Sequence, residues 1–142
     1  MKYFFVALLL VFTSFRPSRY EVTCRGIEGN GLIQLMVGNS QLGSKYKIEL
    51  AKKDALYAVL YTGASGCGKV NHLLSSKESI QKFKKIEKKF FSKNGKWYKY
   101  TRQSTTPSFT GAVGQYVIVV DLPLLRRDLE NLNIIKSMTD GF

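Results

Sequence analysis

The chain has 142 residues, a length typical of a single domain and too short for two separate hydrophobic cores. Apolar residues make up 44% of it and charged residues 23%, with three prolines, which argues against a disordered or fibrous protein. The 22 lysines and arginines give a net charge of +12, which favours polyanionic partners: nucleic acid or an anionic membrane surface. The two cysteines are too few for a disulfide framework, and whether they pair is left open. With a single histidine they also lack the spacing of a zinc site, so neither a metal nor another cofactor is expected.

The N-terminal segment, residues 1–18, has the layout of a signal peptide. Lys2 precedes about ten apolar residues, a run too short to span a bilayer, which takes about 20. However, Phe12, Phe15 and Arg16 crowd the positions where a cleavage site has small residues. The segment therefore predicts either a cleaved signal peptide or a hydrophobic leader outside the domain.

From residue 20 on, the hydrophobic pattern predicts short strands. Residues 20–24 and 45–50 alternate between apolar and polar side chains, which is typical of half-buried strands. Residues 32–37 form an apolar run that ends at turn residues. Residues 56–61 are continuously apolar and predict a more deeply buried strand.

A glycine-rich segment follows this apolar run. Residues 63–69 match the phosphate-loop pattern G-x-x-x-x-G-K, but Val70 lacks the hydroxyl that would bind magnesium. Residues 70–74 look extended rather than helical, so we predict a hairpin turn with a returning strand instead of a nucleotide site. Neither His72 nor Cys67 has a partner in a recognisable catalytic motif, and no enzymatic activity is expected.

The clearest predicted element is a helix over residues 76–93. Ser75 and Glu78 have the spacing of a capping box, and Gly95 supplies a helix stop able to reach positive φ. One apolar stripe recurs near the helical period at Ile80, Phe83, Ile86 or Glu87, and Phe90. Trp97 is expected to fold back and cover this stripe as a core anchor.

The other faces of this helix are rich in lysine. Residues 77–102 hold ten basic residues against two acidic ones, a local charge of +8. A solvated surface is one interpretation, but the self-repulsion of one-sign crowding favours a polyanion-facing patch. The predicted nucleic-acid contacts are Lys69, Lys82, Lys84, Lys85, Lys88, Lys89 and Lys93.

The C-terminal part predicts a strand over residues 115–121 and then a helix. Asp121 is placed to cap that helix, and Pro123 stands in its first turn. Its apolar face is formed by Leu125, Leu129, Leu132 and Ile135. This is either a packing or docking helix, or the start of a helical regulatory domain.

The order of these parts, over residues 20–122, resembles the WGR domain of the poly(ADP-ribose) polymerases. The resemblance is carried by the apolar run 56–61, by the helix end Lys-Phe-Phe-Ser-Lys followed by Asn-Gly-Lys-Trp at 89–97, and by Gly-Gln-Tyr-Val-Ile-Val-Val-Asp at 114–121. It implies an antiparallel sheet with a packed helix, binding of DNA ends and breaks, and a helical regulatory or catalytic partner domain. The Trp-Gly-Arg signature is degenerate, because Cys67-Gly68-Lys69 stands in its place and lacks the stacking aromatic ring.

Taken together, the sequence predicts an α+β fold: an antiparallel sheet with one main helix packed on one face, plus a short C-terminal helix. We divide the chain into the leader, a WGR-like domain at residues 19–122 and a C-terminal amphipathic helix or tail at residues 123–142. Three functions stay open: a non-catalytic nucleic-acid-binding module, a secreted small basic protein or effector, and a truncated fragment of an ADP-ribosyltransferase. The first implies a nuclear protein and the second a cleaved leader.

Overall fold

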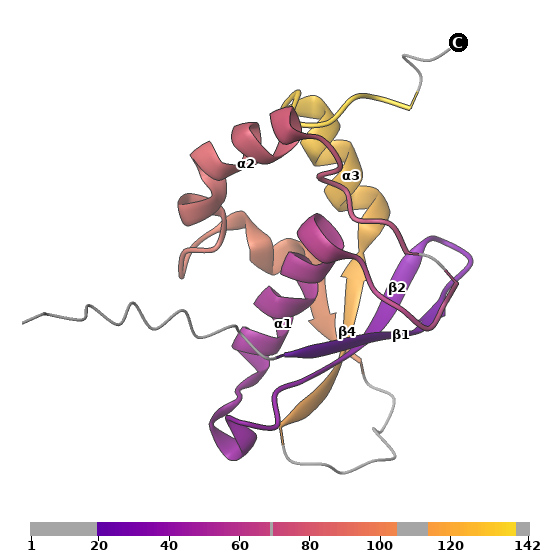
Figure 1. The fold of residues 1–142 in the computed structure, drawn as a ribbon, viewed down its shortest axis with the longest axis vertical. Coiled ribbons are helices and arrows are strands. Elements are labelled where there is room, and N and C mark those ends of the chain that lie inside the picture. The colour runs from indigo at the N-terminus through magenta and orange to yellow at the C-terminus, as the bar shows by residue number, and fades with distance from the viewer. Residues whose placement is uncertain (1–19, 69, 105–113, 139–142) are drawn as a thin grey trace, which may run out of the picture.

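The computed structural model describes residues 20–68, 70–104 and 114–138. Its regular strands and helices, drawn in Figure 1, are β1 (Glu21–Ile27), β2 (Leu32–Gly38), α1 (Ile48–Tyr57), α2 (Lys77–Phe90), β3 (Thr101–Gln103), β4 (Gln115–Asp121) and α3 (Leu122–Asn131). Three short helical turns join them: η1 (Gly43–Lys45), the π turn η2 (Ala58–Thr62) and the 3₁₀ turn η3 (Lys96–Tyr100). In the described part of the chain, no helix has the length and hydrophobicity needed to cross a membrane.

The four strands form one sheet in the order β1-β2-β4-β3, and every neighbouring pair is antiparallel. The predicted α+β class is therefore confirmed. Leu35 of β2 lies opposite both Cys24 of β1 and Ile118 of β4, so alternate residues of the three strands face the same side. That side is the core, where Leu35 and Ile118 are fully buried.

The main helix on this face is α1, whereas the sequence predicted strands over residues 45–50 and 56–61. Both strand predictions are wrong. The buried residues Ala51 and Ala55 are four apart, which is the spacing of one helix face rather than of a strand. The apolar run reads as a strand because η2 extends α1 into the core, where three consecutive residues, Ala58, Val59 and Leu60, are all buried.

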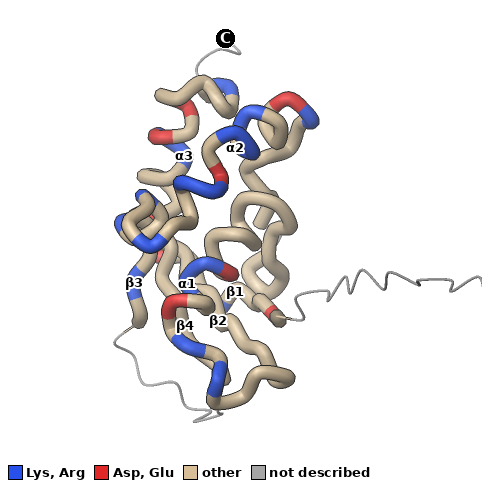
Figure 2. Tube along the Cα trace, turned by 90° about the vertical axis from the view of Figure 1, so that its left-hand side faces the viewer, with Lys and Arg blue, Asp and Glu red and all other residues tan. Residues whose placement is uncertain are grey.

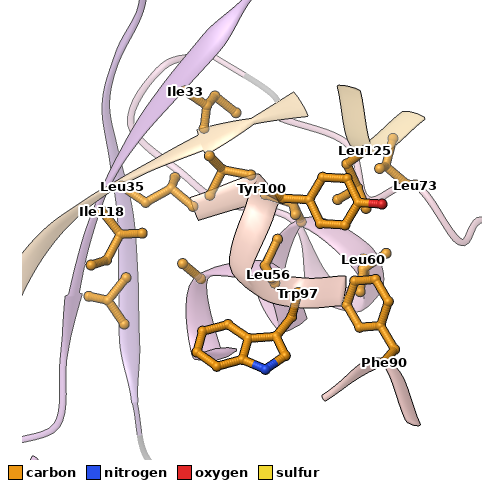
Figure 3. Packing of buried hydrophobic residues seen from close by; sticks show 14 of the residues in the cluster. Ile33, Leu35, Leu56, Leu60, Leu73, Phe90, Trp97, Tyr100, Ile118 and Leu125 are labelled. Carbon is orange, nitrogen blue, oxygen red and sulfur yellow. The ribbon is translucent and has the colours of Figure 1, made fainter. Parts of the chain in front are cut away.

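Figure 3 shows Leu56 and Leu60 lying between two groups of core side chains. The sheet contributes Ile33, Leu35 and Ile118 on one side, while Phe90, Trp97 and Tyr100 lie on the other. The stripe of α2 is therefore buried against η2 and η3 rather than against the sheet. Phe83, Phe90 and Trp97 are buried as predicted, but Ile80 is only half-buried.

The ends of α2 differ in detail from the predicted caps. The N-cap is Ser76 rather than Ser75, and its side chain accepts a hydrogen bond from the Ser79 amide at 3.0 Å. Ser79 Oγ completes the box by accepting from the Ser76 amide.

The predicted positive φ at Gly95 is also wrong, since its φ is −76°. Glycine is needed there because a Cβ would lie 2.1 Å from the carbonyl oxygen of Phe90.

The C-terminal helix α3 follows its prediction more closely. Asp121 is the N-cap and accepts a hydrogen bond from the Leu124 amide at 3.0 Å, with proline in the first turn. Leu125 and Leu129 are buried in the same hydrophobic cluster as the sheet and α1. Leu132 is 53% exposed, because the helix ends before it.

A disulfide joins Cys24 of β1 to Cys67 in the glycine-rich segment. The Cys24 amide donates to the Ser65 carbonyl at 2.6 Å, so this segment lies along the outer edge of β1. Gly66 has φ of +108°, and a Cβ there would lie 2.5 Å from the Cys24 carbonyl oxygen. The segment then turns back, and Val70 pairs antiparallel with Ala64 in an isolated bridge, so the turn is present but the predicted returning strand over residues 70–74 does not form.

We expect the double variant Cys24→Ser/Cys67→Ser to be less stable than the parent. The disulfide closes a loop with a sequence separation of 43, and losing that restraint on the unfolded chain lowers the free energy of unfolding by about 4 kcal/mol. Urea denaturation measures the difference, and the parent in a thiol reductant should match the variant. Equal stability of variant and oxidised parent would contradict the pairing.

Candidate nucleic-acid interface

The stripe of α2 faces inward, so the helical period leaves most of its lysines facing outward. Five of the predicted contact residues are exposed, and together we call them the lysine surface: Lys84, Lys85, Lys88, Lys89 and Lys93. Within the described ranges none of the five forms an ion pair. In Figure 2, blue segments on α2, on α1 and on the chain leading to β3 lie on the side that faces the viewer.

Lys82 differs from the other predicted contacts. Its Nζ lies 2.7 Å from a carboxylate oxygen of Glu78 and donates to the carbonyl of Asn133 at 3.0 Å. The hydrogen bond from Lys82 holds the pKa of Glu78 below its ordinary value. Lys82 thus joins α2 to the end of α3, and its charge is already compensated. Lys69, also predicted as a contact, lies outside the described residues.

The second acid of α2, Glu87, does not neutralise the lysine surface. Its side chain is half-buried and accepts a hydrogen bond from the Tyr61 hydroxyl at 3.1 Å. Burial, and then this bond to Glu87, raise the pKa of Tyr61. Glu87 therefore lies toward the aromatic core, and the outward lysines keep their full charge.

Two consecutive aromatic residues of η3 have opposite environments. Trp97 is 2% exposed, and its Nε1 donates to the Ser92 carbonyl at 2.8 Å, so the predicted core anchor is confirmed. Tyr98 is 60% exposed, and Lys52 Nζ lies 4.8 Å from the centroid of its ring. No sequence pattern described above predicted a role for Tyr98. In a 3₁₀ helix, residues three apart lie on the same side, so Trp97 and Tyr100 both face the core and Tyr98 faces away from it. This three-residue spacing of aromatic side chains is visible in the sequence Lys-Trp-Tyr-Lys-Tyr of η3.

One carboxylate of α3 anchors this turn. Asp128 accepts hydrogen bonds from Lys99 Nζ at 2.5 Å and from the Tyr100 hydroxyl at 2.7 Å. These bonds, that from Lys99 first, hold the pKa of Asp128 below its ordinary value. Tyr100 is held by Asp128 of α3 and stacks on Phe90 of α2, and Tyr98 lies two residues before it in the same turn. The position of Tyr98 therefore depends on both helices.

The segment that matched a phosphate loop has a different setting. It follows a helix rather than a strand, and the next helix, α2, begins only at Lys77. A groove of about 780 Å³ lies between the start of α2 and the end of α3, and His72 is one of its lining residues. Its walls carry both signs of charge: the positive side chains are Lys82, Arg126 and Lys136, and the negative ones are Glu78 and Glu130. Among the residues that the structure describes, no group of three or more metal-binding side chains is found.

Comparison with family models, with curated proteins and with solved structures finds no match to this chain. The resemblance to the WGR domain therefore stays a prediction. One part that carried it, the apolar strand over residues 56–61, is helical in the structure.

We expect Asp128→Asn to destabilise the protein in a pH-dependent way. A carboxylate whose folded pKa lies below its ordinary 3.8 stabilises the fold above that pH, and the contribution is lost as the pH falls through the folded pKa. The variant should therefore lose about 1–2 kcal/mol of unfolding free energy near neutral pH. The loss should disappear in strong acid, where the parent carboxyl is protonated as well.

Urea unfolding at neutral pH and in strong acid measures this difference. Glu130→Gln, which removes the other acid within α3, is the matched control and should show no comparable change. A loss of the same size at both pH values would show that packing, rather than the charge of Asp128, is responsible.

Proposed function

We propose that this protein is a non-catalytic nucleic-acid-binding protein whose lysine surface contacts the phosphate backbone. The observation that carries the proposal is the set of five exposed lysines, all without an ion-pair partner among the described residues. Phosphates that meet such lysines release their condensed counterions, which supplies affinity without reading sequence. Little sequence preference is therefore expected.

The spacing of the lysines supports this assignment. From Lys84 to Lys89 the helix rises about 7.5 Å, and a DNA duplex carries one charge per about 1.7 Å of its axis. The lysine surface thus faces about four phosphates. The acids that would make an ordinary mixed-sign surface are engaged elsewhere, Glu78 with Lys82 and Glu87 with Tyr61.

The salt dependence of duplex binding tests the proposal. For about four phosphates, the slope of log affinity against log salt concentration should be about −4. Replacing Lys84, Lys85 and Lys88 by glutamine should flatten this slope by about two or more units. Thermal stability should change little, because exposed lysines without partners add little to folding. Fluorescence anisotropy with a labelled duplex at several salt concentrations measures the slope.

A matched control separates the lysine surface from net charge. Arg25, Lys45 and Lys47 are exposed and lie on β1 or ahead of α1. Their triple glutamine variant loses the same three charges and should keep most of the parent slope. If both triple variants behave alike, or if the lysine-surface variant binds like the parent, the lysine surface is only solvated and the proposal fails.

A second candidate is a secreted protein that binds an anionic membrane surface, and the Cys24–Cys67 disulfide favours it. Disulfides persist in oxidising compartments and are rare in the cytosol and nucleus. The predicted signal peptide at residues 1–18 agrees with this candidate. Mass measurement of the mature protein from its own cells should then find the leader removed and no free thiol. An intact leader with two free thiols would favour a nuclear, nucleic-acid-binding protein.

A further inference from the structure

We infer that the exposed ring of Tyr98 is a stacking platform for a base of single-stranded nucleic acid. The inference rests on the proposed function and adds to it the class of ligand. It concerns a different chemistry from the lysine surface, because stacking recognises the face of an unpaired base rather than a phosphate.

The backbone that carries Tyr98 is held by buried neighbours on both sides. Trp97 is bonded through its ring nitrogen to Ser92, and Tyr100 stacks on Phe90 with ring centroids 5.8 Å apart and an interplanar angle of 16°. Asp128 fixes the same turn from α3. An exposed ring on so well anchored a turn loses little conformational freedom when it binds a ligand.

The surroundings of the ring are cationic. Lys52 Nζ lies 4.8 Å from the ring centroid and the neighbouring Lys96 is also exposed, whereas the charge of Lys99 is compensated by Asp128. An ammonium that reaches the ring also reaches the phosphates on either side of a stacked base. α2 leads through Lys93 into η3, so Lys93 is the member of the lysine surface nearest to Tyr98 in sequence. Aromatic rings interleaved with lysines along a groove or ridge are typical of proteins that bind single strands.

The geometry favours a single strand over a duplex and over a membrane. In a duplex the base faces are stacked on each other, so a ring on the protein surface cannot reach them without unstacking. A membrane surface binds through several apolar side chains that insert together. Among the described residues of 77–102, Tyr98 is the only large hydrophobic side chain that is exposed.

The test compares two labelled probes at one salt concentration, a 12-nucleotide oligothymidylate and a 12-base-pair duplex. Tyr98→Leu keeps an apolar side chain but removes the ring, and should weaken binding of the single strand by about 5- to 150-fold. Binding of the duplex and its salt slope should not change. Tyr98→Phe should bind both probes like the parent, and a thermal melt checks that each variant is folded.

Tyr57→Leu is the matched control, since Tyr57 is also an exposed tyrosine but lies on α1, away from the lysine surface in sequence and on another element. It should bind the single strand like the parent. If Tyr98→Leu also binds it like the parent, while the Lys84, Lys85 and Lys88 variant loses both probes, the inference is overturned and the proposed function stands.

The other outcomes are equally decisive. Equal weakening of both probes by Tyr98→Leu overturns the inference, because the ring would then support the fold or a backbone contact. A loss of binding to phosphatidylserine vesicles with no change on either nucleic acid would assign Tyr98 to a membrane surface. A parent that binds neither probe overturns both the inference and the proposed function.

Discussion

The burial of η2 and of one face of α1 is the constraint on which the rest of the structure depends. The side chains that make this segment the centre of the core are all fully buried: Ala51, Ala55, Leu56, Ala58, Val59 and Leu60. Three of the six are alanines, which let neighbouring backbones approach closely. The carbonyls of Val59 and Leu60 accept hydrogen bonds from the Leu73 and Leu74 amides, so these two buried carbonyls near the end of the helix have partners.

Because α1 occupies the sheet face, α2 can bury its stripe only against η2 and η3, further from the sheet. This arrangement leaves α2 with one buried side and a broad outward side, on which the lysines carry no structural duty. The same packing holds Trp97 inward and its neighbour outward. Charge and exposed aromatic area thus lie where the fold buries neither of them.

The sequence predicted the outer elements well and the centre poorly, for a physical reason. Periodicity reveals one-sided burial, so α2, α3 and β1 were recognisable, while β2 and β4 were recognised as short apolar runs. A helical turn whose consecutive residues are all buried, as Ala58, Val59 and Leu60 are, shows no periodicity, and its apolar run is indistinguishable from a buried strand. The lysine surface was predictable, because the apolar stripe of α2 determines which side of the helix faces outward. The Cys24–Cys67 disulfide was not predictable, because it depends on the docking of a distant loop that no local pattern reveals. The exposure of Tyr98 follows from the 3₁₀ turn of η3, which has no apolar periodicity long enough to be recognised in the sequence.

The strip of chain along the outer edge of β1 bears on how the protein matures. A free strand edge is a template for pairing with another chain, and here Ser65 occupies part of that edge beside Thr23 and Cys24. Before the strip docks, the open edge of β1 and the Cys24 thiol lie at the same place in the nascent chain. Two such chains that met there would add strand to strand, and in an oxidising compartment, where an external oxidant takes up the two electrons, they would then be cross-linked covalently. When the Cys24–Cys67 disulfide forms within one chain instead, Ser65 covers part of the edge of β1 and both thiols are consumed. Pairing of two chains at this edge is then disfavoured.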